Sequence, residues 1–180
     1  MNAKEQMVAV WEEHLKREFI TREPDSPTQT MVPDAIVNHV PTMTGGVGVA
    51  ELRRFYREHF VTVNPDDLEF TPVSRTIGED AIVDELVISF THSRAIDYLL
   101  PGVAPTGRRV QIPAVSIIHF REGKIASERI YWDQASVLVQ IGAIDAAGLP
   151  VAGAEIALKV LDPSLPSNAL IERLSPGTSA

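Results

Sequence analysis

Two residues of the chain combine a titratable side chain with surroundings that favour acid/base chemistry. Asp97 stands in the apolar run "AIDYLL", and a carboxylate in such company needs a partner or a raised pKa. His39 ends the strand-like segment "AIVNH", and a histidine can accept or donate a proton near neutral pH. Each also has a structural explanation: Asp97 as an exposed loop carboxylate, and His39 as a buried histidine with satisfied hydrogen bonds.

A third candidate lies in "RIYWDQASVLVQIG", residues 129–142, which changes from a strand pattern to a helix pattern at Trp132-Asp133. Asp133 precedes the helix, so we expect its carboxylate to cap the helix N-terminus, with a pocket acid/base role as the alternative. Trp132 is expected in the core or in the wall of a ligand pocket. Three further side chains are expected to line that pocket, with core packing as the alternative for the first: Tyr56, His92 and Tyr98.

A run of helices followed by a run of strands must position these residues. Apolar side chains recur every four positions and predict an amphipathic helix over residues 5–20: Met7, Trp11, Leu15 and Phe19. Ser26 before Pro27 predicts a short second helix that Pro33 ends. The remaining expected elements are a strand over 35–40, a helix over 49–60, strands over 68–77, 81–97, 108–120 and 124–132, and helices over 134–141 and 154–162.

This order of elements predicts an α+β fold with one long antiparallel sheet. The segments 81–97 and 108–120 carry apolar residues on both parities, whereas a sheet with one wet face alternates apolar and polar residues. We therefore expect the N-terminal helices to cover one face and a second subunit or the C-terminal tail to cover the other. A homodimer through the sheet is the resulting prediction.

Composition argues against several classes of function. The net charge of −8 and the lack of a basic stripe disfavour a nucleic-acid partner. The chain has no cysteine, and its five histidines form no His-x-His or His-Glu-x-x-His pattern, so we expect no metal. The glycines of "GGVGVAE" lack the spacing of a nucleotide-binding loop, and no other cofactor is expected. No apolar run approaches ~18 residues and no leader pattern is present, which favours a cytoplasmic protein that binds no membrane.

The element order resembles the nuclear transport factor 2-like superfamily, in which a curved sheet wraps on helices into a cone with an interior pocket. Within it, residues 99–142 are similar to the SnoaL-like polyketide cyclase group, and "VNHVPTMTGGVGVAELRRFY" resembles the group's first strand and helix. The motifs that carry the resemblance are Pro-Thr-Gly-Arg at 105–108, Glu-Gly-Lys-Ile at 122–125, the pair Trp132-Asp133, and Val-Leu-Val-Gln-Ile-Gly at 137–142. The chain also looks like a subgroup associated with carboxymethylenebutenolidase. The resemblance implies a SnoaL-like domain over 1–142 and a C-terminal extension over 143–180, partly helical and docked or loose.

The resemblance also bears on the site. Cyclases of the group use a pocket Asp as acid/base, and an ungapped alignment places Ile130 at that position and Asp133 at a second Asp. Glu128 shares the strand face of Ile130, so it becomes a candidate acid deeper in the cone, with a salt bridge as its alternative. In the limonene epoxide hydrolase branch the template is an Arg and two Asps. Asp97 matches one Asp, while Arg94 is displaced by one residue.

These observations give one expected function and one alternative. The catalytic candidates are Asp97, His39, Asp133 and Glu128, and the expected ligand pocket is lined by Tyr56, His92, Tyr98, Ile130 and Trp132. We expect a small-molecule-binding protein that performs cyclase-, isomerase- or hydrolase-type acid/base chemistry on a carbonyl- or lactone-containing compound. No Gly-x-Ser-x-Gly elbow or cysteine is present to serve as a dienelactone hydrolase nucleophile. The alternative is a non-catalytic ligand-binding or accessory domain, which the apolar Ile130 favours.

Overall fold

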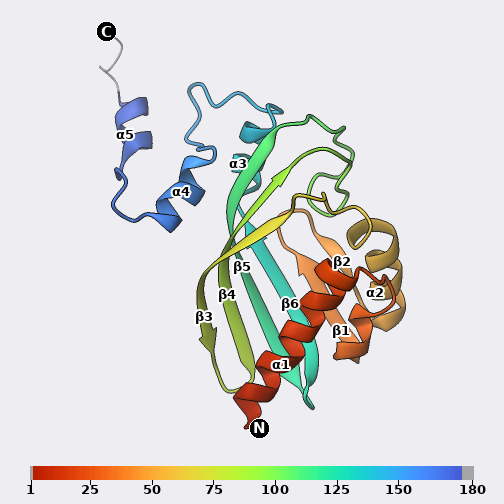
Figure 1. Ribbon diagram of the computed structural model, residues 1–180. Coiled ribbons are helices and arrows are strands. Elements are labelled where there is room, and N and C mark those ends of the chain that lie inside the picture. Colours follow the sequence, from red (N-terminus) through yellow and green to blue (C-terminus); the bar gives the residue numbers. More distant parts are fainter. Residues whose placement is uncertain (1, 176–180) are drawn as a thin grey trace.

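A curved six-stranded sheet forms the centre of the fold, and the N-terminal helix crosses its concave face (Figure 1). The computed structural model describes residues 2–175. The strands lie side by side in the order β2-β1-β6-β5-β4-β3. Their bounds are β1 Met31–His39, β2 Thr44–Val47, β3 Glu69–Ile77, β4 Ala81–Thr91, β5 Arg109–Arg121 and β6 Lys124–Trp132. The α+β cone expected from the sequence is confirmed.

The first helix, α1 (Ala3–Lys16), begins with a capping box and buries one stripe of side chains. The side chain of Asn2 accepts a hydrogen bond from the Glu5 backbone N–H, and the Glu5 carboxylate accepts one from the Asn2 N–H. The helix continues into a π-helical turn, η1 (Arg17–Thr21), so the expected helical stretch is present. Its buried stripe begins with the apolar residues Met7 and Trp11 and ends with the polar residues His14 and Glu18.

The segment after α1 differs from the expectation at Pro33. The short helix after Ser26 is present as the 3-10 helix η2 (Pro27–Thr30), but the chain enters β1 directly at Met31 and Pro33 lies inside this strand. The pairing of β1 with β6 shifts register between Met31 and Ile36. Because a register shift leaves backbone groups outside the ladder, the missing N–H of a proline is tolerated there.

The sheet is mixed, which corrects the expected all-antiparallel arrangement. β1 pairs parallel to β6 and antiparallel to β2, and the other neighbours are antiparallel. The strand that comes last in the sequence, β6, therefore lies between β1 and β5 in the sheet. Two helical segments, α2 (Gly48–Phe55) and the π-helical η3 (Tyr56–Phe60), follow β2 and form the expected helix over 49–60.

The expected strand over 81–97 is wrong in its last six residues, because β4 ends at Thr91. Residues 92–108 form a loop that joins β4 to β5. The hydroxyls of Thr42 and Thr44 donate hydrogen bonds of 2.7 and 2.9 Å to the carbonyl oxygen of Tyr98. These bonds hold the loop against the turn between β1 and β2, so its apolar residues pack without joining the sheet.

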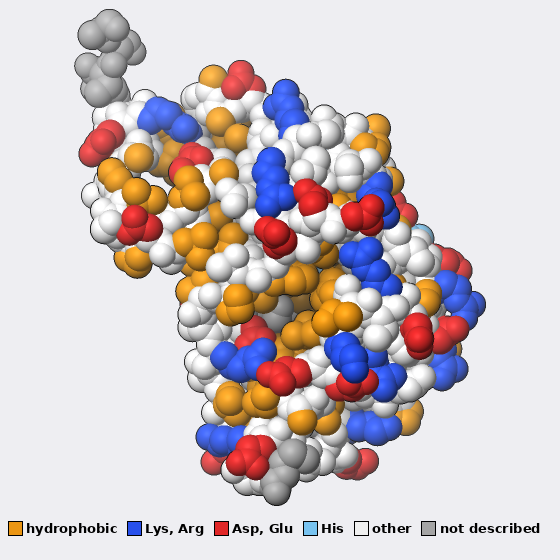
Figure 2. All heavy atoms as spheres, viewed as in Figure 1, with side chains coloured by type: hydrophobic (Ala, Val, Ile, Leu, Met, Phe, Trp, Pro, Cys, Tyr) orange, Lys and Arg blue, Asp and Glu red, His pale blue; other side chains and the backbone are white. Residues whose placement is uncertain are grey.

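Three short helices follow the sheet: α3 (Gln134–Gln140), α4 (Glu155–Leu161) and α5 (Ala169–Leu174). α4 packs against β5 and β4, and α5 lies farthest from the sheet (Figure 1). Hydrophobic side chains gather on the surface of this C-terminal part, as Figure 2 shows, and Ile171 is 67% exposed. The division of the chain at residue 142 and the homodimer stay predictions. No helix within residues 2–175 has both the length and the apolar character needed to cross a membrane.

Candidate functional site

A cluster of polar side chains is buried between α1 and the concave face of the sheet. It comprises His14, Glu18, Thr30, Tyr56 and Glu128, and we call these five residues the polar cluster. The two glutamates are at most 4% exposed, and His14 and Tyr56 are fully buried. Glu18 and Tyr56 lie in the π-helical turns η1 and η3, and such turns occur frequently at functional sites.

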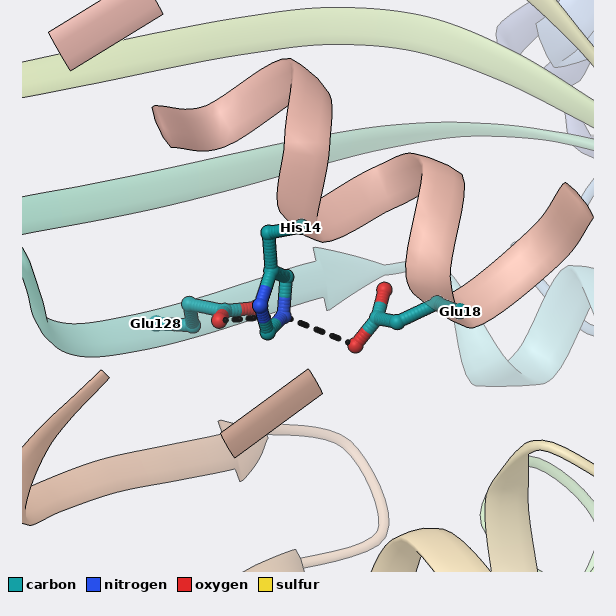
Figure 3. Close-up of side chains that lie close together, drawn as sticks. All are labelled: His14, Glu18 and Glu128. Atoms are coloured by element: carbon teal, nitrogen blue, oxygen red, sulfur yellow. Dashed lines mark hydrogen bonds and ion pairs between the residues drawn. The ribbon is translucent and has the colours of Figure 1, made fainter. Parts of the chain in front are cut away.

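The imidazole of His14 is the centre of the polar cluster. Its Nε2 lies 3.0 Å from Glu18 Oε1 and 3.1 Å from Glu128 Oε1 (Figure 3). The hydroxyl of Tyr56 lies 3.3 Å from the same nitrogen. Nδ1 lies 2.7 Å from Thr30 Oγ1, whose own proton is donated to the carbonyl oxygen of Pro27 at 2.7 Å. Side chains from four elements, η1, η2, η3 and β6, therefore converge on one ring of α1.

Burial and charge shift the pKa values in the polar cluster in opposite directions. Burial lowers the pKa of His14, but the two carboxylates outweigh it and raise that pKa to about 10. Burial raises the pKa of the Glu18 carboxyl, and His14 partly offsets this effect. Burial and the nearby carboxylates raise the pKa of the Tyr56 hydroxyl. The pKa values in the polar cluster are thus set by burial and by contacts among its own side chains rather than by water.

Trp11 fixes α1 over the polar cluster. Its ring stacks on His14 with centroids 5.6 Å apart, and its Nε1–H donates a 2.7 Å hydrogen bond to Asp84 on β4. Arg75 on β3 binds the same carboxylate through two hydrogen bonds of 2.6 and 2.8 Å. A bidentate arginine pair of this kind gives geometric specificity. The helix is therefore held to two strands next to His14.

His39 lies at the end of β1, surrounded by aromatic rings. Its register partner on β6 is Ile130, and the ring centroids of its four aromatic neighbours lie 5.0 to 6.0 Å away: Phe55, Phe60, Tyr98 and Trp132. Nδ1 lies 3.3 Å from the carbonyl oxygen of Thr44, which can only accept, so Nδ1 carries the proton. Within residues 2–175, Nε2 makes no hydrogen bond. Burial lowers the pKa of His39 to about 4, and the imidazole is neutral at pH 7.

Aromatic side chains connect His39 with the surface. The rings of Phe60 and Phe19 lie 5.7 Å apart, and those of Phe19 and Phe70 lie 4.7 Å apart. Phe70, on the edge strand β3, is 39% exposed. We call His39, Phe60, Phe19 and Phe70 the aromatic run. Figure 2 shows a hollow with largely hydrophobic walls between β3 and α1. A separate surface groove shares no residue with the aromatic run or the polar cluster, and it is lined by Asn2, Lys4, Glu5, Val8, Ala9, Glu12 and Ile77.

Of the expected catalytic residues, the structure places Glu128 and His39 on the interior face of the sheet. Val37 and His39 of β1 are the register partners of Glu128 and Ile130 of β6, so the four side chains share one face. Asp97 lies elsewhere: its carboxylate is 46% exposed and contacts His59 Nδ1 at 3.2 Å. The structure therefore does not bring Asp97 together with His39.

The expected pocket residues divide between the interior and the loop over it. Tyr56 is in the polar cluster, and Tyr98 and Trp132 contact the ring of His39. Ile130 is half-buried and packs against the core. His92 is buried where the loop leaves β4, with Nδ1 3.2 Å from Thr106 Oγ1 and with Nε2 lacking a hydrogen-bond partner among the described residues.

Asp133 is exposed and caps α3, as the first of its two expected roles proposes. Its Oδ1 accepts a 3.0 Å hydrogen bond from the backbone N–H of Ser136. Asp133→Ala is expected to lower the free energy of unfolding by about 1 kcal/mol, because one N–H at the start of α3 loses its acceptor. Urea unfolding of the variant tests this, with Asp133→Asn as the control that keeps a capping oxygen. A variant as stable as the original protein would contradict the capping role.

The fold belongs to a class of α+β domains in which helices pack on the concave face of a curved sheet. Similar solved structures include a hypothetical protein from Catenulispora acidiphila DSM 44928 with a ketosteroid isomerase-like fold, at 15% identity and a TM-score of 0.56, covering 76% of this chain and 92% of that chain. The model of the SnoaL-like polyketide cyclase family matches residues 4–141, and the chain belongs to this family.

Two further solved structures share the fold. TsrD from Streptomyces laurentii is 19% identical, with a TM-score of 0.60 over 77% of this chain and 96% of that chain. The epoxide hydrolase/cyclase-like enzyme SalBIII, described as acting in pyran ring formation in the polyether salinomycin, is 21% identical, with a TM-score of 0.53 over 73% of this chain and 95% of that chain. Curated proteins gave no match.

Proposed function

We propose that the chain is a small-molecule enzyme in which His39 activates a hydroxyl group for addition to the carbonyl carbon of a bound lactone or other carbonyl compound. The observation that carries the proposal is the hydrogen-bond state of His39. Because Nδ1–H is held by the carbonyl oxygen of Thr44, Nε2 offers a free lone pair on a neutral ring. Membership of the SnoaL-like family supports a ligand of the carbonyl class.

The step needs only one proton carrier. The hydroxyl, from water or from the ligand itself, donates a hydrogen bond to Nε2 and passes its proton there as its oxygen bonds to the carbonyl carbon. Burial disfavours the imidazolium, so His39 then gives the proton to the former carbonyl oxygen or to the leaving ring oxygen and returns to neutral. General-base catalysis of this kind contributes about 10²–10⁴-fold to a rate.

The aromatic run supports a preference for planar, unsaturated ligands. Its rings extend from exposed Phe70 to His39, so a ligand ring that enters along it can pack edge-on or offset against phenyl groups. The register partner of His39 on β6 is the apolar Ile130, and the carboxyl group on the same face of β6, Glu128, is opposite Val37 instead. The imidazole must therefore work without the Asp that the family's cyclases place on this strand.

Lactone hydrolysis tests the proposal. We expect the protein to hydrolyse the aromatic lactone dihydrocoumarin faster than the aliphatic γ-butyrolactone, measured with a pH indicator. His39→Gln should lower kcat/KM at least about 100-fold, since the base is lost. His59→Gln, which changes an exposed histidine, is the matched control and should keep full activity. Equal rates for the original protein and His39→Gln would refute the role of His39.

A non-catalytic ligand-binding module is the second candidate, and Ile130 at the family's acid/base position favours it. Its signature would be saturable quenching of tryptophan fluorescence by dihydrocoumarin with no acid release. Trp132 contacts the ring of His39, so it reports a ligand bound there. His39→Gln would then change the affinity alone.

A further inference from the structure

The polar cluster contains two acidic side chains and one basic side chain. His14 is its only basic side chain, while Glu18 and Glu128 each bring a carboxyl group, and within residues 2–175 no lysine or arginine forms an ion pair with either. Both carboxyl groups are buried, and a buried carboxylate needs a partner of opposite charge, which a bound cation can supply.

Glu128 Oε1 marks the place where such a cation can bind. Its Oε1 is 3.1 Å from His14 Nε2, yet it finds no hydrogen-bond donor among residues 2–175. The hydrogen-bond geometry of Nε2 is satisfied by Glu18 instead. An imidazole nitrogen has a single N–H, so it cannot point at both carboxylates at once. Oε1 of Glu128 is therefore buried, aimed into the polar cluster and left without a donor among the described residues.

Thr30 fixes the tautomer and the orientation of the His14 imidazole in a way that suits metal binding. Its hydroxyl has one proton, which is donated to the carbonyl oxygen of Pro27, so Thr30 Oγ1 must accept a hydrogen bond from His14 Nδ1–H. Nε2 then faces the two carboxylates. Metal-binding histidines almost always donate their other ring N–H in this manner, because the hydrogen bond fixes the tautomer and the ring orientation.

The donor atoms also have suitable spacing. Nε2 is 3.0 and 3.1 Å from the two carboxylate oxygens, and all three atoms lie within 4.8 Å of one another. Ligands bound at ~2.1 Å from one ion lie roughly 3 Å apart in an octahedral site. We propose that His14, Glu18 and Glu128 bind one divalent transition-metal ion, such as Zn²⁺ or Mn²⁺, through Nε2 and a carboxylate oxygen each.

The donor set selects the class of ion. Two carboxylates neutralise a divalent cation, and one imidazole favours Zn²⁺, Mn²⁺ or Fe²⁺ over Ca²⁺ and Mg²⁺, which prefer oxygen ligands alone. His14 and Glu18 stand four residues apart across the junction of α1 and η1, and Glu128 approaches from β6. The inference does not depend on the proposed role of His39.

Metal titration of the tag-free, chelator-treated full chain tests the site. We expect calorimetry to show one Zn²⁺ or Mn²⁺ per chain, a higher Tm with either ion, and no comparable effect of Mg²⁺ or Ca²⁺. Glu128→Gln should weaken binding by more than about 100-fold, since changes outside the ligand set already cost about 10–100-fold. Thr30→Val, which removes only the acceptor for Nδ1–H, should weaken it by about 10–100-fold.

The exposed group His59, Asp97 and Glu58 provides the matched control. His59 lies 3.2 Å from Asp97 and 3.7 Å from Glu58, so it is a plausible surface site for stray zinc. His59→Gln should leave the titration unchanged. The proposal is overturned if no ion binds, or if binding survives Glu128→Gln and disappears in His59→Gln. Circular dichroism confirms that each variant folds, and Glu18→Gln replaces Glu128→Gln if the latter does not.

Discussion

His14→Leu is expected to lower the free energy of unfolding by about 3–5 kcal/mol. The substitution leaves Glu18 and Glu128 buried in the polar cluster without the imidazole between them. Two buried carboxylates without a cation must separate, take up protons or admit water. Urea unfolding at pH 7 with a chelator present measures the effect in the metal-free protein.

The matched control removes the whole charged group. In the triple variant His14→Leu, Glu18→Met and Glu128→Met, no charge is left to desolvate, and replacement of a buried ionic group by apolar residues is often neutral or stabilising. The triple variant should therefore recover most of the stability that His14→Leu loses. Two outcomes would contradict the view of this group as a coupled set of charges. One is a loss of less than about 1 kcal/mol in His14→Leu, and the other is a triple variant that is less stable than His14→Leu.

Apart from β2 and α5, the order of helices and strands could be predicted because it follows from local patterns. The helix over 5–20 and the strand over 124–132 show periodicities of about four and two residues, and the structure confirms both. The parallel pairing of β1 with β6 could not be predicted in this way. It depends on contacts between strands that are about 90 residues apart in the sequence, and no local pattern predicts such contacts.

Glu128 and Tyr56 of the polar cluster were predicted as site residues, but His14 and Glu18 were missed although α1 carries a signal for them. Met7, Trp11, His14 and Glu18 are separated by four, three and four residues, which is the spacing of one helix face, so the two polar residues had to share the burial of the first two. The spacing of the apolar residues alone predicts Leu15 and Phe19 in the stripe instead, and these are only half-buried. A polar residue that continues the helical spacing of an apolar stripe should therefore be predicted to be buried with that stripe.

Asp97 shows the opposite error of inference. Its neighbours Ile96, Tyr98 and Leu99 are buried, but the loop after β4 turns the carboxylate outward to His59. Apolar neighbours in sequence predict the burial of a side chain only where the backbone is regular, because a loop can point successive side chains in any direction. The strand residue Glu128 was placed on the interior face because β-strands alternate strictly and it shares that face with Ile130.

The stability of the protein is expected to fall by roughly 3 kcal/mol between pH 7 and pH 4 through His39 alone. Burial lowers the pKa of His39 from 6.5 to about 4, while the Thr44 carbonyl and the charge of Glu128 oppose this shift. Below pH 6.5 the unfolded chain takes up a proton that the folded chain refuses. His39 therefore contributes full stability above pH 6.5, and the contribution is lost as the pH falls through 4.

His39→Gln isolates this contribution from the other acidic and basic groups, which are the same in both proteins. Urea unfolding at half-unit steps from pH 4 to pH 7.5 should give a shallower pH dependence for the variant, and the difference between the two curves should be confined to pH 4–6.5. His59→Gln should reproduce the original curve, because it replaces an exposed histidine that lies outside the aromatic surroundings of His39. Parallel curves for the original protein and His39→Gln would mean that water reaches His39 freely. The aromatic rings around His39 would then not provide the dry surroundings that keep the imidazole neutral and its Nε2 available.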